Sequence, residues 1–148
     1  MNSWVELGYL GLFVSAFLAA TILPASSEVV LSALLLQNLS PIVLVAIATF
    51  GNVLGSLTNY AIGYWLGKPA IQRFTKTTDN EFEKAISGFN KYGLVSLCFA
   101  WVPIVGDPLT VVAGVIRVRL LWFVCLVTLG KLARYAVLAW IILGVTNR

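Results

Sequence analysis

The chain has 148 residues, of which 59% are hydrophobic and 11% are charged, and its formal net charge is +4. Because soluble domains contain roughly 25% charged residues, this composition argues against a water-soluble enzyme or binding domain and predicts a single polytopic membrane domain over residues 1–148. The sequence has no histidine and no recognisable nucleophile–base pair. We therefore expect no enzyme activity, no metal site and no cofactor. The basic residues do not alternate with aromatic ones on a common face, so no nucleic-acid partner is expected.

The first apolar segment, residues 4–23, nearly reaches the ~20 residues that a helix needs to cross a bilayer. No basic residues precede it, as they would in a signal peptide, so we expect it to be retained. Four positions separate Pro24 from Glu28, and the apolar run at 29–39 is too short to span. Proline interrupts a helix, and a carboxylate is costly in lipid. This predicts a re-entrant hairpin with Glu28 near its tip, although a hairpin that crosses completely remains open.

Residues 42–66 are apolar and long enough to span the membrane with room to tilt. Small residues recur along this segment at four-residue spacing, which lets another backbone approach closely: Gly51, Gly55, Asn59, Gly63 and Gly67. Asn52 lies near this stripe. Asn52 and Asn59 are candidates either for hydrogen bonds to hairpin backbone or for substrate binding.

The polar connector at residues 68–92 contains five basic residues. Thr78 and Glu81 have the spacing of a capping box, and apolar residues then recur at helical spacing over 82–89. This pattern predicts a short amphipathic helix at the membrane surface. Its basic residues, together with Arg117 and Arg119, predict a cytoplasmic connector and external termini by the positive-inside tendency.

A second hairpin is predicted because the first pattern repeats at an offset of 79 residues, so that Asp107 corresponds to Glu28. Its flanking apolar runs, residues 94–102 and 109–116, are again too short to span. One full span separates the two hairpins, which would therefore enter from opposite faces. Four residues are expected to break the helices near the tips: Pro24, Pro103, Gly106 and Pro108.

The last apolar segment, residues 120–145, contains Lys131 and Arg134 three positions apart, on one helix face. At 1.5 Å per residue, Lys131 lies roughly 17 Å into this span. We expect the two cations to pair with Glu28 and Asp107. The four groups could simply lock the bundle together. They could instead form a transport path, in which the cations bind an anionic headgroup and the desolvated carboxylates take up and release protons.

The expected fold is an all-α integral membrane protein, built as an inverted repeat of a re-entrant helical hairpin plus a transmembrane helix. Repeat 1 covers about 4–67, and repeat 2 about 93–147. The connector between them is residues 68–92.

Four stretches together resemble the DedA family of bacterial membrane proteins, which carry the VTT or SNARE-associated domain, and most closely its small YqaA-like branch. They span nearly the whole chain: Pro24–Glu28, Gly51–Gly63, Val102–Gly114 and Gly130–Tyr135. The sequence departs from many relatives in carrying Trp101 and Asp107 near the second proline, where those relatives carry arginines.

The resemblance implies two opposed re-entrant hairpins in a multi-pass protein of the bacterial inner membrane. It also implies transport of a phosphate-bearing lipid, such as undecaprenyl phosphate or a phospholipid, driven by the proton motive force. The alternative is an energy-independent scramblase or membrane-assembly factor. The glutamate of the family's first hairpin maps to Glu28, and a late arginine to Arg134. Expected partners are the bilayer, an anionic lipid headgroup and protons, with a homo-oligomer possible.

Overall fold

The computed structural model describes residues 3–21, 25–74, 78–102 and 106–147, and these residues form helices without any strand. In chain order the elements are α1 (Ser3–Ala19), α2 (Ser26–Leu35), α3 (Pro41–Phe74), α4 (Asp79–Tyr92), the 3₁₀ helix η1 (Gly93–Trp101), α5 (Gly106–Val115) and α6 (Leu120–Thr146). The predicted all-helical class is confirmed. Pro24 and Pro103, the two prolines expected at the hairpin tips, lie outside the described residues.

Two helices among the described residues are long and apolar enough to cross a membrane: Pro41–Gly67, which is the first part of α3, and Leu120–Thr146, which is α6. Both match the spans predicted from the sequence. At Gly67 the backbone adopts φ 64° and ψ −162°, which interrupts α3. Glycine reaches this conformation without the steric cost that a Cβ would impose. Helical structure then resumes as far as Phe74, so α3 extends into the polar connector that was predicted to begin at residue 68.

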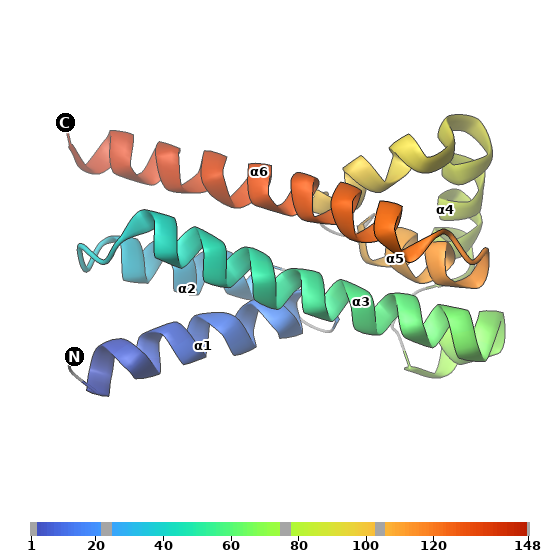
Figure 1. Ribbon diagram of the computed structural model, residues 1–148, viewed down its shortest axis with the longest axis horizontal. Coiled ribbons are helices and arrows are strands. Elements are labelled where there is room, and N and C mark those ends of the chain that lie inside the picture. The colour runs from blue at the N-terminus through green and yellow to red at the C-terminus, as the bar shows by residue number, and fades with distance from the viewer. Residues whose placement is uncertain (1–2, 22–24, 75–77, 103–105, 148) are drawn as a thin grey trace.

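The shorter helices pair on either side of the two long ones (Figure 1). α1 runs from the end that holds both termini to about the middle of α3, and α2 returns beside it. η1 and α5 make a similar excursion from the opposite end, where α4 lies. Two separate cores result. Leu12, Leu31 and Leu44 belong to the first, and Leu97, Val112 and Phe123 belong to the second.

Glycines set the close helix contacts, as the small-residue stripe predicted. A methyl group added at Gly51 would lie 2.6 Å from the Phe13 carbonyl oxygen of α1, and one at Gly55 would lie 2.5 Å from that of Phe17. One added at Gly63 would instead collide with the backbone of α5 at Val111. The stripe therefore packs against α1 with its first half and against α5 further along.

The amphipathic helix predicted in the connector forms as α4. The Thr78 side chain accepts a hydrogen bond from the Glu81 backbone N–H, and the Glu81 carboxylate accepts one from the Thr78 backbone N–H at 2.8 Å. This is the predicted capping box. Ala85 and Phe89 are buried in the second core. The helix thus packs its apolar face against η1 and α5.

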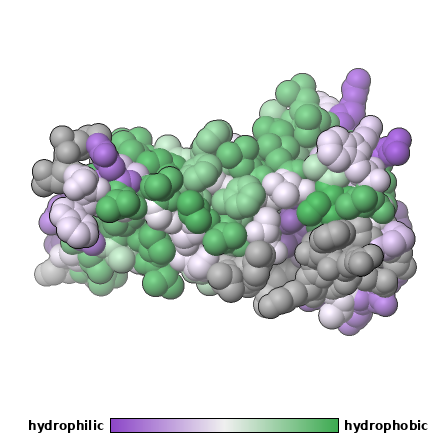
Figure 2. Space-filling model, turned by 90° about the horizontal axis from the view of Figure 1, so that it is seen from below, coloured by the Kyte–Doolittle hydropathy of each residue, from purple (hydrophilic) through white to green (hydrophobic). Residues whose placement is uncertain are grey.

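Apolar side chains cover most of the outer surface between the two ends of the molecule. Figure 2 shows this band on one face, with hydrophilic residues gathered toward the ends. On α6, Leu129, Val137 and Trp140 are exposed. Exposed apolar residues over this length fit a helix bundle surrounded by lipid rather than water.

Candidate functional site

An ion pair joins the first hairpin to the middle of α6. The Nε–H of Arg134 donates to Glu28 Oε1 at 2.7 Å, and its Nη2 also contacts that oxygen. The Arg134 Nη1–H donates to the Trp101 carbonyl oxygen at 2.9 Å. One guanidinium therefore ties α6 both to α2 and to the end of η1. Of the acids expected as partners, it is Glu28 that pairs with Arg134.

Lys131 starts a hydrogen-bonded chain behind this ion pair. Its side chain is only 4% exposed, and its Nζ donates to the Oδ1 of Asn52. The Asn52 Nδ2–H donates to Tyr135 Oη at 2.8 Å, and this hydroxyl shares a 2.8 Å hydrogen bond with Ser27 Oγ. Because every link lies between different helices, the chain holds α2, α3 and α6 in one arrangement.

The two carboxylates occupy equivalent places in their hairpins. Glu28 lies in the first turn of α2, and Asp107 lies in the first turn of α5. A negative charge is favoured there by the helix dipole. Asp107 lines the same small cavity as Lys131 and Arg134. The cluster thus contains two cations and two acids, and it is neutral when all four groups are charged.

A small polar cavity lies inside this cluster. Its volume is about 10 Å³, and its polar lining comes from Ser27, Asn52, Asp107, Lys131 and Arg134. A cavity of that size holds about one water molecule. The cavity is too small for a phosphate group.

An apolar groove of about 380 Å³ adjoins the cluster on the outer surface. It is lined mainly by side chains of η1 and α6, with Trp101, Leu129 and Val137 among them. Arg134 lines both this groove and the polar cavity. Its side chain, 16% exposed, is therefore placed between a charged interior and a surface suited to lipid tails.

Asn59 lies about two helical turns from Asn52, and the structure places it in a different contact. Its Nδ2 donates to the Ala20 carbonyl oxygen at 2.7 Å and to Thr110 Oγ1 at 3.3 Å. It thereby joins the two hairpins and does not line the charged cavity.

Gly106 and Pro108, predicted to break the helix, are buried in the first turn of α5. No three His, Cys, Asp or Glu side chains gather as metal ligands in the described ranges.

Two groups of the site were not predicted. Tyr135 is 1% exposed and connects Asn52 to Ser27. The sequence held one signal for Tyr135: it lies four residues after Lys131 and therefore on the same helix face. The Trp101 carbonyl is the other group, and a backbone acceptor for Arg134 leaves no mark in the sequence.

Comparisons with known proteins identify the family of the chain. Residues 7–144 match the VTT domain family. The chain is 42% identical to the inner membrane proteins YqaA of Escherichia coli K12 and Shigella flexneri over 137 residues, which cover 90% of this chain and 89% of each relative. It is 37% identical to a Haemophilus influenzae protein over 138 residues, which cover 88% of this chain and 84% of that protein. No solved structure matches the chain significantly. The chain therefore belongs to the VTT-domain, or DedA, family of membrane proteins.

Proposed function

We propose that this protein carries a phosphate-bearing lipid, such as undecaprenyl phosphate or a phospholipid, across the bacterial inner membrane in a proton-coupled process. The observation that carries the proposal is the position of Arg134, which lines both the small polar cavity and the apolar groove. An amphiphilic anion needs these two environments side by side. Its headgroup binds the guanidinium, and its tail stays in the groove, in contact with lipid.

Protonation supplies the coupling in this proposal. Glu28 holds Arg134 while it is ionised. A proton on Glu28 removes the charge that pairs with the guanidinium, so Arg134 becomes free for a headgroup. Asp107, which lines the same small cavity as Lys131 and Arg134, acts in the same way from the opposite side. Lys131 and Asn52 then complete the headgroup site, while Asn59 contributes only when the hairpins that it joins move apart.

The membrane arrangement we propose is an inverted repeat of two re-entrant hairpins and two spans. Its support is that α1, α2, η1 and α5 are each shorter than the ~20 residues of a span, and that the two pairs approach from opposite ends (Figure 1). Gly51 packs on α1. Gly130, 79 positions later, packs on η1, where an added methyl would lie 2.9 Å from the Cys98 carbonyl oxygen. Each long helix thus meets the first helix of its own hairpin at an equivalent glycine.

Transfer of a fluorescent lipid in liposomes tests the function. We expect purified protein to move labelled phosphatidylglycerol or undecaprenyl phosphate between leaflets faster when a pH gradient is imposed than when an ionophore collapses it. Empty liposomes and the variant Glu28→Gln, which keeps the size of the side chain but cannot ionise, are the controls. Equal transfer with and without the gradient would favour the scramblase alternative. Transfer no faster than in empty liposomes would refute both.

Cysteine labelling tests the orientation. In a background with Cys98 and Cys125 replaced by alanine, we expect Asn80→Cys, in the exposed first turn of α4, to resist an impermeant thiol reagent in intact cells. Ser3→Cys, at the start of α1, should react. Permeabilised cells should label at both positions, which controls for accessibility. Labelling of residue 80 but not residue 3 in intact cells would reverse the proposed topology.

A further inference from the structure

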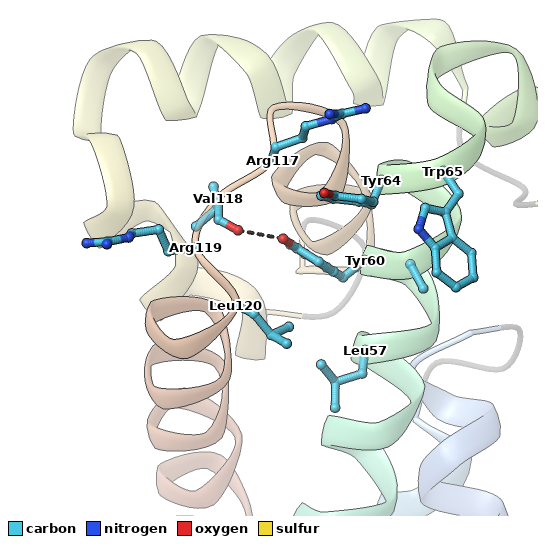
Figure 3. A pocket seen from close by; sticks show the side chains of 9 residues that line it. Leu57, Tyr60, Tyr64, Trp65, Arg117, Val118, Arg119 and Leu120 are labelled. Carbon is cyan, nitrogen blue, oxygen red and sulfur yellow. Dashed lines mark hydrogen bonds between the residues drawn. The ribbon is translucent and has the colours of Figure 1, made fainter.

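A larger cleft lies away from the charged cluster, between α3 and the loop that joins α5 to α6 (Figure 3). Its volume is about 590 Å³. Leu57 and Leu120 form its apolar end, between the two long helices, and Tyr64, Trp65 and Arg117 lie at its other end. Arg119 also lines the cleft, but its side chain extends away from these residues. The cleft therefore has an apolar part and a cationic, aromatic part along one axis.

Arg117, which lines the cleft, has an unfavourable backbone conformation. α5 ends with Arg117 in the left-handed region, at φ 56°. Its N–H donates to the Gly114 carbonyl oxygen at 3.0 Å, and that of Val118 to the Ala113 carbonyl oxygen at 3.0 Å. This kind of helix end normally has glycine at the left-handed position, since a side chain there is strained. Strain of this sort is tolerated at sites where a side chain is needed.

The structure also holds this strained loop firmly against α3. The Tyr60 hydroxyl donates to the Val118 carbonyl oxygen at 2.5 Å, as Figure 3 shows. The Arg117 guanidinium lies 4.8 Å from the centre of the Tyr64 ring, a cation–π contact. Arg119 extends on the other side of Val118. The Arg117 guanidinium is therefore held over the face of the Tyr64 ring.

Among the residues that the structure describes, the lining of the cleft contains two arginines and no acidic side chain. Within the described ranges, neither arginine forms an ion pair. Trp65, at the edge, is 80% exposed, and exposed tryptophan and tyrosine favour the headgroup level of a bilayer. These features suit an anion at the depth of lipid phosphates, with the apolar end of the cleft toward the acyl chains.

We propose that this cleft binds an anionic phospholipid of the leaflet nearest α4, with its phosphate on Arg117 and its acyl chains along Leu57 and Leu120. This site is separate from the central cluster, and the proposal does not depend on whether the protein transports lipid. The bound lipid would link α3 to the loop between α5 and α6.

Native mass spectrometry of the full chain in detergent tests the proposal. We expect phosphatidylglycerol to bind in preference to phosphatidylcholine, and Arg117→Gly to weaken its binding about tenfold, as loss of a charged hydrogen-bond partner typically does. Because glycine suits the left-handed backbone, this variant should unfold at the same temperature as the wild type or higher. Arg117→Asn, which also tolerates that backbone, should behave likewise.

Lys91→Gln, at the end of α4, is the matched control for loss of one positive charge, and it should leave phosphatidylglycerol binding unchanged. In vesicles, the fluorescence of Trp65 is obtained as the difference between the wild type and Trp65→Phe. Brominated phosphatidylglycerol should quench this fluorescence more strongly than brominated phosphatidylcholine does. Equal binding of the two lipids, equal quenching by both, or equal weakening by Arg117→Gly and Lys91→Gln would overturn the proposal.

Discussion

Replacing Arg134 with glutamine should abolish lipid transfer and also lower stability, and a second substitution should separate the two effects. Arg134→Gln leaves Glu28 without its partner. Removing one member of a buried pair costs about 3–5 kcal/mol, and the partial exposure of both side chains reduces this to about 1–3 kcal/mol. Adding Glu28→Gln removes the uncompensated charge and should restore most of the lost stability.

Transfer should remain absent in that double variant, because the group that we propose binds the headgroup is still missing. Arg134→Lys keeps the charge but loses the planar fork that matches a phosphate, so we expect it to be folded and to transfer lipid poorly. Thermal unfolding in detergent and lipid transfer in liposomes should be measured on the same preparations, with Lys91→Gln as the charge control. A stable double variant with normal transfer would show that the ion pair is only a structural lock.

Adding one methyl group at Gly63 should destabilise the bundle by about 3 kcal/mol, at the upper end of typical overpacking costs. The new Cβ would collide with the carbonyl group of Val111, and Gly114 on α5 has the same relation to Tyr60. In both cases the obstacle is backbone, which cannot move aside as a flexible side chain can. The helices α3 and α5 would have to separate, and the Asn59–Thr110 hydrogen bond would weaken with them.

Gly144→Ala supplies the matched control, because this glycine of α6 has no atom within 4 Å of an added methyl. Alanine is a better helix former than glycine, so this variant should be as stable as the wild type or slightly more so. The measurement is thermal unfolding in detergent. A Gly63→Ala protein that unfolds at the same temperature as Gly144→Ala would mean that the close crossing of α3 and α5 does not contribute to stability.

Features of the fold that depend on local sequence were predictable. Hydropathy over about 20 residues defined both long helices, and the spacing of Thr78 and Glu81 defined the start of α4. The pairing of Arg134 with a hairpin acid followed from the cost of an isolated charge in lipid. In each case a single physical requirement, namely span length, helix capping or charge pairing in lipid, can be met by few structures.

Other features depend on contacts between distant segments. The first hairpin helix ends at Ala19, four residues before the expected limit, and the first helix of the second hairpin is 3₁₀ rather than α. The role of Tyr135 depends on partners 83 and 108 positions away in the chain. No local pattern encodes such distances, so side-chain spacing alone could not distinguish Asn52, which lies in the cluster, from Asn59, which joins the hairpins.

The ion pair has a consequence for how the protein is made. Glu28 and Arg134 are 106 residues apart, and at 5–20 residues per second the ribosome needs roughly 5–20 s to synthesise the intervening chain. During that time the first hairpin has neither its cation nor the Tyr135 hydroxyl that contacts Ser27. Until α6 is made, Glu28 therefore lacks the cation that pairs with it, and the contacts that join α2 to α6 form only once the C-terminal helix is in place.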